Sequence, residues 1–195
     1  MDDYLKIINL DEVDSTNDYL AGLAREGAKE ITVVTAKSQS KGKGRQGRVW
    51  VSPAGAGVYL SFLLRPKNPL KEVNLLPLLF GLGVARALSG IVAAKIKYPN
   101  DLLVNGKKIC GILVETRSLN DEVEFVIAGV GVNVNSKQEE IPEQATSLFL
   151  ETGKKYDVSK LTKRIIKEEV GIYRIFKSDS FNGLIEEANL KLKKP

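Results

Sequence analysis

The stretch Leu102-Leu103-Val104-Asn105-Gly106-Lys107-Lys108-Ile109-Cys110-Gly111-Ile112-Leu113-Val114 decides the fold class of this chain. Two apolar runs are joined there by Asn-Gly, the dipeptide that suits a type I′ turn, so the stretch predicts a β-hairpin. Other β-rich runs and segments of helical periodicity alternate around it. Strands joined by a hairpin and interspersed with helices predict an α+β fold with a mixed, mainly antiparallel sheet flanked by helices.

The same kinds of signal on either side of this stretch predict the remaining elements. We expect strands at Tyr4–Leu10, Ile31–Thr35, Val58–Leu64, Lys95–Tyr98 and Val123–Val134. We expect helices capped at Asp14 and Ser15 and stopped at Gly27, over Leu75–Leu88, over Val158–Phe176, and a short fraying helix from Phe181. The polar, glycine-rich segment Ser38–Arg48 is predicted to be a loop.

The overall composition is that of one globular domain. The chain has 195 residues, 43% of them hydrophobic and 27% charged. It has no apolar run of membrane-spanning length, and it opens on acidic residues rather than a signal peptide, so we expect a cytoplasmic protein without membrane association. Cys110 is the single cysteine, which excludes an intramolecular disulfide. The chain contains no histidine, so His-based acid–base chemistry and imidazole metal sites are excluded, and we expect no metal site.

The positive charge is concentrated in one part of the sequence. The formal net charge is +5, and no acidic residue occurs from Ile31 to Lys71. The basic residues of that span are Lys37, Lys41, Lys43, Arg45, Arg48, Arg65, Lys67 and Lys71. Charge of one sign favours an anionic partner. Nucleic acid, a nucleotide phosphate, an acidic protein surface and a merely solvated basic face all stay open at this point.

The first segment with chemical potential runs from Gln39 to Trp50. Its alternating glycines allow a backbone to approach a ligand, and free N–H groups there can bind an anion. Lys43, Arg45 and Arg48 add positive charge, and the single tryptophan could cover an adenine or another ligand. The spacing matches neither a P-loop nor a dinucleotide fingerprint. Taken alone, this loop could equally be a nucleic-acid arm.

Two further segments carry polar groups next to strands. In Lys97-Tyr98-Pro99-Asn100-Asp101 and the hairpin after it, strand alternation puts Lys108 on one face with Cys110, and Lys107 on the other with Ile109. One lysine must therefore point inward, unless the strand is bulged, and an inward lysine usually meets an anion. In the strand from Ala128 to Asn135, the glycines indicate a bulge or the close approach of a ligand, and the amide of Asn133 could hydrogen-bond the edge of a purine or a ureido group. Without a ligand role, the first segment would be an edge hairpin with exposed lysines, and the second would be a strand that ends in an Asx turn.

Taken together and in order, these segments resemble the biotin–protein ligase family. The resemblance includes Glu12-Val13-Asp14-Ser15-Thr16-Asn17, the basic loop ending at Trp50, the Pro-Asn-Asp hairpin, Gly-x-Gly-x-Asn-x-Asn, and Ala145-Thr146-Ser147-Leu148. It implies a fold shared with lipoate ligases and related to the class II aminoacyl-tRNA synthetase core. It also implies a two-step reaction with ATP and Mg²⁺. Biotin is first activated as biotinyl-5′-adenylate and then transferred to a lysine of a biotin carboxyl carrier protein domain of a biotin-dependent carboxylase.

The resemblance assigns roles to particular residues. The biotin site would comprise Ser15, Thr16, Asn17, Gln39, Gly42, Lys43, Arg45, Lys108, Gly111 and Gly129. The ATP site would comprise Arg45, Arg48, Trp50, Lys97, Asn100, Lys108 and Asn133. The catalytic roles would fall to Lys108, Arg45 and Asp101, with Lys108 against the carboxylate and α-phosphate and Asp101 orienting the incoming lysine. Neither step needs an enzyme nucleophile, so a chain without histidine is compatible with the reaction.

The chain also departs from the family pattern. Lys43 stands where arginine is frequent, and Tyr98 where tryptophan usually precedes Pro-Asn-Asp. We expect residues 1–180 to form the catalytic domain. Residues 181–195 would be a tail where the family's small β-barrel domain would begin, with that domain missing. We expect no N-terminal DNA-binding domain and no sequence-specific DNA binding, and a homodimer stays open. A lipoate–protein ligase and a basic nucleic-acid-binding module are the alternative functions. The 7% of aromatic residues, which are not interleaved with the basic loop, speak against the second.

Overall fold

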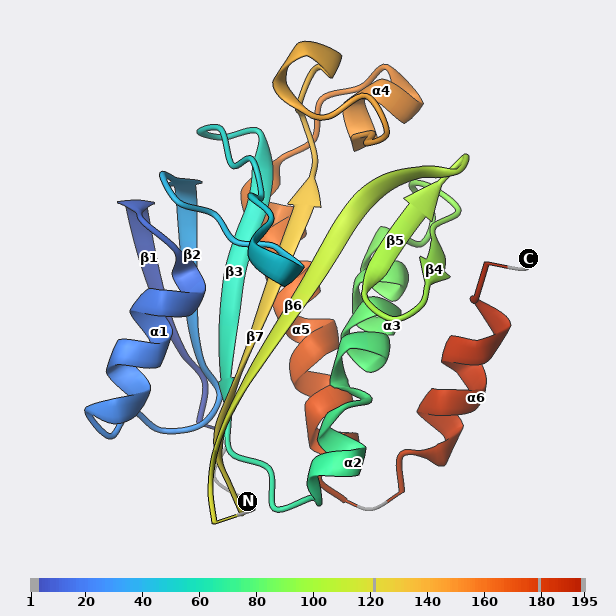
Figure 1. The fold of residues 1–195 in the computed structure, drawn as a ribbon. Helices are drawn as coiled ribbons and strands as arrows, with labels where there is room; N and C mark the ends of the chain where they lie inside the picture. The colour runs from blue at the N-terminus through green and yellow to red at the C-terminus, as the bar shows by residue number, and fades with distance from the viewer. Residues whose placement is uncertain (1–3, 121, 179, 194–195) are drawn as a thin grey trace.

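The chain forms a single twisted sheet with helices on both faces. A computed structural model describes residues 4–120, 122–178 and 180–193, and over these residues the sheet has seven strands in the order β1-β2-β3-β7-β6-β5-β4 (Figure 1). β1 and β2 are parallel, and every other neighbouring pair is antiparallel. The predicted mixed, mainly antiparallel sheet is confirmed. The strands are β1 (Lys6–Val13), β2 (Thr32–Gln39), β3 (Gly57–Leu64), β4 (Lys95–Lys97), β5 (Asp101–Val104), β6 (Lys107–Leu119) and β7 (Glu122–Asn133).

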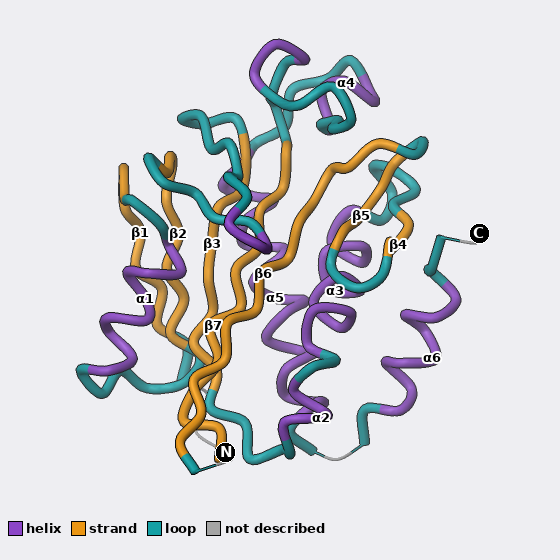
Figure 2. Tube along the Cα trace, viewed as in Figure 1, coloured by secondary structure: helices purple, strands orange, loops and turns teal. Residues whose placement is uncertain are grey.

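The helices divide between the two faces of the sheet (Figure 2). One face is covered by α3 and α5, and the other carries α1 over β2, β3 and β7. The helices are α1 (Thr16–Arg25), α2 (Leu70–Val73), α3 (Leu76–Leu88), α4 (Leu148–Thr152), α5 (Val158–Phe176) and α6 (Asn182–Leu190), with 3-10 turns η1 (Arg45–Gly47) and η2 (Gln138–Glu140). Among the described residues, none of these helices combines the length and the apolar character that a membrane span requires.

The position of β3 in the sheet explains why residues 57–64 are almost all apolar. All of its residues are buried, because β3 lies in the middle of the sheet with a helix layer on either side. Its side chains alternate between two cores: Phe62 belongs to the main core with α3 and α5, whereas Leu63 packs with Leu20 of α1. A strand buried on both faces reads as a continuous apolar run.

The predicted hairpin forms with the turn that the sequence indicates. Asn105 and Gly106 have φ angles of 48° and 83°, the positive values that a type I′ turn requires at both positions. β6 continues beyond its predicted end at Val114 to Leu119, whereas β7 begins and ends within one residue of the predicted bounds, and the two strands form the longest pair in the sheet. β1 begins two residues later than expected, at Lys6, and β2 extends to Gln39 into the segment predicted to be a loop.

The segment from Phe181 differs from the fraying helix that we expected. It forms α6, whose Leu184 and Ala188 are buried in the main core. Glu187 also pairs with Arg86 of α3. Apolar burial and this ion pair hold α6 against α3, so the helix belongs to the same core as the rest of the chain. The short helices α2 and α4 were not predicted, because four or five residues are too few for a periodic signal.

Candidate functional site

Three glycines leave the upper part of one sheet face without side chains. Gly111 of β6 pairs with Gly131 of β7, and Gly129 of β7 pairs with Ser61 of β3. A Cβ atom on Gly129 would lie 2.3 Å from Oδ1 of Asn17, and one on Gly131 would lie 2.5 Å from the Trp50 indole. The glycines are therefore required for the close approach of Asn17 and Trp50 to the sheet. Together these residues form the floor of the site.

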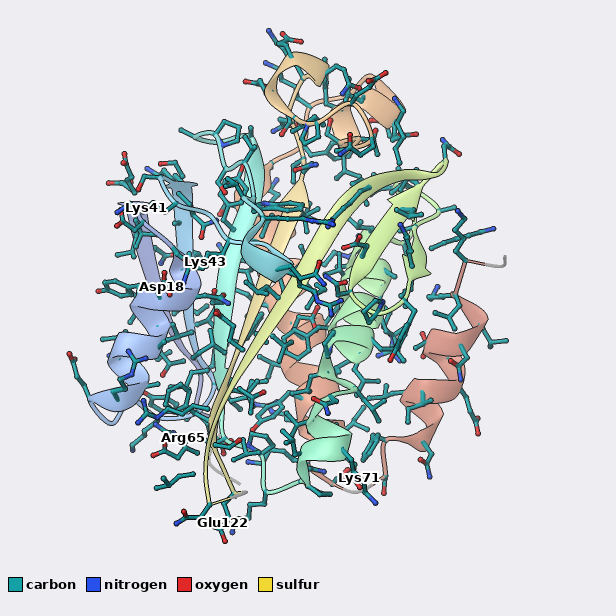
Figure 3. All side chains as sticks on the ribbon, viewed as in Figure 1. Asp18, Lys41, Lys43, Arg65, Lys71 and Glu122 are labelled. Carbon is teal, nitrogen blue, oxygen red and sulfur yellow. The ribbon has the colours of Figure 1, made fainter. Side chains whose placement is uncertain are left out.

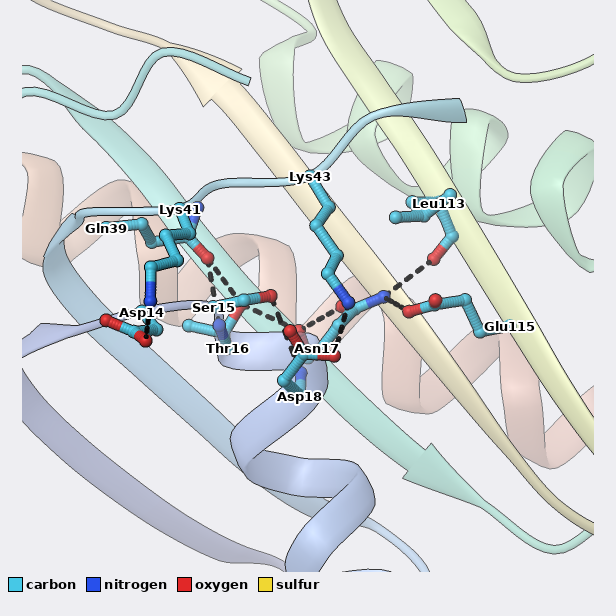
Figure 4. Close-up of polar contacts among 11 residues, drawn as sticks. Asp14, Ser15, Thr16, Asn17, Asp18, Gln39, Lys41, Lys43, Leu113 and Glu115 are labelled. Atoms are coloured by element: carbon cyan, nitrogen blue, oxygen red, sulfur yellow. Dashed lines mark hydrogen bonds and ion pairs between the residues drawn. The ribbon is translucent and has the colours of Figure 1, made fainter. Parts of the chain in front are cut away.

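The start of α1 supplies the polar wall (Figure 4). Ser15 caps α1 by accepting a hydrogen bond from the Asp18 amide. Next to it, the amide and hydroxyl of Thr16 both donate to Oε1 of Gln39, at 2.9 and 3.1 Å. Nδ2 of Asn17 donates to the Glu115 carboxylate at 2.6 Å. Because most of these polar atoms already have protein partners, the wall is pre-organised.

The basic loop lies across this wall, and polar contacts hold it on both sides. Lys41 pairs with Asp14, just before α1, and Lys43 pairs with Asp18 in the first turn of α1 (Figure 4). The hydrogen bond that Lys43 donates to the Asp18 carboxylate raises the pKa of Lys43 above its usual value. On the far side, Nη1 of Arg45 donates to the Asn100 side chain at 3.1 Å. The loop therefore bridges α1 and the segment before β5.

Lys108 reaches the site face because β6 is irregular. The pairing of β5 with β6 shifts between Leu102 and Leu103, so that Leu102 faces Cys110 but Leu103 faces Lys108, and Ile109 is the extra residue of a β-bulge. The bulge puts Lys108 on the same face as Gly111, whose Cβ atom would lie 3.2 Å from the Lys108 ammonium. Our prediction that Lys108 shares a face with Cys110 is therefore wrong: Cys110 is fully buried in the main core.

The Lys108 ammonium is the centre of a charged cluster. It lies 2.6 Å from Oδ1 of Asp101, and both side chains are largely shielded from solvent. It also lies 5.4 Å from the centre of the Trp50 ring, within the range of a cation–π interaction. The described residues offer no hydrogen-bond acceptor to the buried Nε1 of Trp50. The cluster thus combines a held cation with an aromatic surface.

Two adjoining pockets open around this cluster. The first, here the α1 pocket, lies between the start of α1, the basic loop and the glycines of the floor, and has about 460 Å³ of empty space, a volume that includes open solvent. The second, the β5 pocket, is wider at about 1280 Å³, a volume that includes open solvent at its mouth. They share a boundary formed by Gly44, Arg45, Trp50, Asn100 and Lys108. A ligand in each pocket would therefore meet the other at Arg45 and Lys108.

The residues predicted from the sequence divide between these pockets. The α1 pocket is lined by every residue predicted for biotin except Gly42: Ser15, Thr16, Asn17, Gln39, Lys43, Arg45, Lys108, Gly111 and Gly129. The β5 pocket is lined by every residue predicted for ATP: Arg45, Arg48, Trp50, Lys97, Asn100, Lys108 and Asn133. Gly42 instead packs behind the loop, where a Cβ atom would lie 2.3 Å from the carbonyl oxygen of Trp50.

The β5 pocket is strongly positive. Four basic side chains line it, and among the described residues Asp101 is its only acidic one, already paired with Lys108. The bases are Arg45, Arg48, Lys97 and Lys108. Such a pocket favours a polyanion. In the part of the chain that the structure describes, no three His, Cys, Asp or Glu side chains gather as a metal site would need.

Several site residues were missed in the sequence. Ser61 is fully buried, and its hydroxyl contacts both the Thr16 hydroxyl and the Asn17 side chain. Ser52 receives a hydrogen bond from Gln39 and donates one to the Trp50 carbonyl. Ser61 could have been found, because it interrupts an apolar strand. Glu115, the partner of Asn17, gives no comparable signal.

Comparison with known proteins agrees with this geometry. The profile of the biotin/lipoate A/B protein ligase family matches residues 10–133. The bifunctional ligase/repressor BirA of Bacillus spizizenii is 38% identical over 166 residues, which cover 82% of this chain and 51% of that protein. The biotin–[acetyl-CoA-carboxylase] ligase of Mycobacterium tuberculosis is 34% identical, over 79% of this chain and 59% of that protein.

A solved structure gives the same result for the fold. The biotin protein ligase of Aquifex aeolicus in complex with biotin and ATP superposes with a TM-score of 0.80 at 35% identity, covering 97% of this chain and 79% of that chain. The chain spans only about half the length of the curated relatives it matches. The region that the family profile matches nevertheless includes every site residue predicted from the sequence, from Ser15 to Asn133. The chain therefore belongs to the biotin/lipoate A/B protein ligase family, as a catalytic domain of the biotin–protein ligase type.

Proposed function

We propose that the chain is an ATP-dependent biotin–protein ligase, which forms biotinyl-5′-adenylate and passes biotin to a lysine of a biotin carboxyl carrier protein domain. The observation that carries this proposal is the contact of the two pockets at Arg45 and Lys108. A reaction between a carboxylate and a phosphate needs the two anions in contact, with positive charge at that point. The Aquifex aeolicus relative, described in complex with biotin and ATP, supports the choice of ligands.

Biotin fits the α1 pocket by its chemistry. Its ureido ring would meet the polar wall, where the Ser15 hydroxyl accepts from the backbone and keeps its hydrogen for a ligand. The valeryl chain would lie over the glycine floor beside Asn17. The carboxylate would then reach Lys43 and, at the shared boundary, Arg45 and Lys108.

MgATP fits the β5 pocket. The adenine would lie against Trp50 and within reach of Asn133, and the phosphates would meet Arg48 and Lys97 as well as the boundary residues. Magnesium would enter as part of this co-substrate, held mainly by phosphate oxygens. With one carboxylate against four bases, the lining offsets the charge of the polyphosphate.

The first chemical step joins the two ligands. A carboxylate oxygen of biotin would attack the α-phosphorus of ATP, and the bond between that phosphorus and the α,β-bridging oxygen would break to release pyrophosphate. Arg45 and Lys108 would stabilise the charge that crowds around the α-phosphate. The product is a mixed anhydride, and no group of the enzyme is covalently modified.

The second step uses the same boundary. The uncharged amine of a carrier lysine would attack the carbonyl carbon of the anhydride, forming an amide and releasing AMP. Asp101 lies beside this point and would orient the incoming amine and accept its proton. The pairing of Asp101 with Lys108 keeps both groups in position until the ligands arrive.

The geometry weighs against the two alternatives. A lipoate ring would offer no acceptor to the hydroxyl hydrogen of Ser15, which faces the α1 pocket. The basic stretch does not form one nucleic-acid surface either. Lys41 and Lys43 lie at one end of the sheet, whereas Arg65 lies at the other and donates to backbone carbonyls (Figure 3).

Fluorescence of the single tryptophan separates the three functions. Trp50 lies between the pockets, so we expect its emission to change on titration with biotin, and with ATP added afterwards, but not with lipoate or a single-stranded oligonucleotide. A saturable response to lipoate without one to biotin would assign the chain to lipoate. A response to the oligonucleotide alone would favour the nucleic-acid module. Transfer is tested separately, by mass spectrometry of a carrier domain incubated with biotin and MgATP.

A further inference from the structure

Segment 144–146 runs beside Lys108 as a short additional strand. The Lys108 amide donates to the Gln144 carbonyl at 3.0 Å, and the Lys108 carbonyl accepts from the Thr146 amide at 2.8 Å. Ala145 forms an isolated parallel bridge with Lys108. Both main-chain hydrogen-bonding groups of Lys108 are therefore bound by this segment. Because the neighbouring residue Ile109 is bulged, β5 alone does not fix the backbone here.

Thr146 links this segment to a second site residue. Its carbonyl accepts a hydrogen bond from Nδ2 of Asn133 at 3.0 Å, and both residues are buried. Thr146 thus contacts Lys108 through its amide and Asn133 through its carbonyl. Any displacement of Thr146 would move two residues that line the β5 pocket.

Glu151 of α4 holds this arrangement from outside the pockets. Its Oε1 accepts from the Thr146 hydroxyl at 2.5 Å, and its Oε2 accepts from Nδ2 of Asn105 at 2.7 Å. Asn105 belongs to the turn that leads into Lys108. One carboxylate therefore joins the two backbone segments that flank Lys108, although it lines neither pocket itself. Bonds to a charged carboxylate are stronger than neutral ones.

We infer that Glu151 is a positioning residue for adenylate formation, acting through Thr146 and Asn105 on Lys108 and Asn133. The inference rests on the proposed function for its chemical consequence. A lysine side chain is long and flexible, so the place of its ammonium depends on how firmly its backbone is held. A misplacement of about 1 Å in a reacting site can lower the rate about 10²-fold.

The test compares three variants. We expect Glu151→Ala to lower the rate of adenylate formation by about 10- to 100-fold and to raise the KM for ATP, with biotin affinity within twofold of wild type. Glu151→Gln should restore most of the rate. Its amide oxygen can still accept from Asn105, and its NH₂ group can donate to the Thr146 hydroxyl, which is also an acceptor. Glu143→Ala is the matched control, because Glu143 is an exposed carboxylate immediately before segment 144–146.

Amide hydrogen exchange gives a readout that does not depend on activity. The Lys108 and Thr146 amides should exchange faster in Glu151→Ala than in wild type, and Thr146→Val, which removes the hydroxyl alone, should act in the same direction. The inference is overturned if Glu151→Ala matches Glu143→Ala in both assays. It is also overturned if biotin binding and adenylation fall together. A wild-type chain that forms no adenylate would contradict the proposed function. The hydrogen-exchange result would still decide whether Glu151 holds the backbone beside Lys108.

Discussion

At the scale of single residues, Lys108 holds the position on which the proposed chemistry depends. Its ammonium lies 2.6 Å from Asp101 and 5.4 Å from the Trp50 ring centre, at the boundary of the two pockets. Its neighbour Lys107 is exposed and lines neither pocket. Two adjacent lysines of equal charge thus provide an internal comparison.

Lys108→Ala should abolish most adenylate formation while sparing biotin binding. Loss of one pre-organised charge contact typically costs about 3–4 kcal/mol, or 10²–10³ in rate, and here it also leaves Asp101 unpaired next to the phosphates. The matched variant Lys107→Ala should retain nearly the full rate. Single-turnover kinetics and Trp50 fluorescence measure the two effects separately. Equal losses in biotin affinity and in the rate of adenylate formation would show that Lys108 contacts the substrate already in the ground state.

Gly131→Ala should weaken ATP binding more than biotin binding. The added Cβ would meet the indole at 2.5 Å, so Trp50 must move away from the floor and toward the β5 pocket. Gly22→Ala is the control, since a Cβ there meets nothing within 4 Å. The KM for ATP and the emission maximum of Trp50 are the measurements. An unchanged emission maximum would show that the indole does not lie on the floor.

Many residues of the site could be predicted from the sequence, but the register of the strands that carry them could not. Glycines in β7 predicted a bulge or the close approach of a ligand, and the structure shows that the groups in close approach there are the side chains of Asn17 and Trp50. The face of Lys108 was predicted wrongly, since a bulge at Ile109 depends on segment 144–146, which is remote in sequence. Ser61 and Glu115 contact Asn17 only through the tertiary fold.

At the scale of elements, the basic loop is held by ion pairs rather than by apolar burial. Lys43 and Asp18 form one such pair, and both side chains are about half exposed. Pairs of this kind contribute about 0–1 kcal/mol. The loop can therefore open at low cost to admit a ligand.

Asp18→Asn should make the loop easier to cut by a protease. A loss of up to about 1 kcal/mol corresponds to at most about a fivefold faster cleavage between Lys41 and Arg48 in the ligand-free chain. The difference should shrink at about 1 M salt, which screens exposed pairs. Asp11→Asn is the control, because Asp11 pairs with Lys37 in β2, outside the loop. Equal cleavage of the two variants would show that Lys43 does not fasten the loop.

Between α5 and α3, Glu169 introduces a pH dependence of stability. Its side chain is fully buried against Gly83, and burial, with a smaller contribution from Glu168, raises its pKa well above the ordinary 4.5, although Arg86 opposes the shift. The folded chain therefore keeps this proton to higher pH than the unfolded chain. The contribution of Glu169 to stability is complete below about pH 4.5 and is lost as pH rises through the folded pKa.

Glu169→Gln should remove this dependence. For wild type, the Glu169 contribution to the free energy of unfolding should fall by at most about 1.4 kcal/mol per pH unit above pH 4.5, and the variant should lack this slope. Urea unfolding across the pH range measures it, with Glu143→Gln as an exposed control. Parallel curves for Glu169→Gln and wild type would contradict the buried proton.

Long elements were predictable because their pattern is local. The apolar periodicity of α5 and the Asn-Gly turn are both determined by local sequence, and α5 has the bounds that we predicted. The ends of β2 and β6 were not predictable, because pairing with neighbouring strands extends them past the apolar runs. The short α4, which holds Glu151, is fixed by tertiary contacts such as the one with Asn105.

At the scale of the whole molecule, the fold keeps one end of the sheet free for ligands. α1 covers the lower part of the face through Leu20 and Leu63, and the glycine floor begins where this apolar packing ends. The α1 pocket and the β5 pocket both lie there, with basic residues concentrated at their boundary. Under the proposed function, this division of one sheet face into a packed half and an open half would bring the two ligands into contact.

The most direct test of this account is the biotin-dependent exchange of labelled pyrophosphate into ATP, which detects reversible adenylate formation without a carrier. We expect exchange that requires biotin, that lipoate and octanoate do not support, and that Lys108→Ala lowers by about 10²–10³. Exchange that proceeds without biotin, or that lipoate supports and biotin does not, would contradict the claim that the two joined pockets make biotinyl-adenylate.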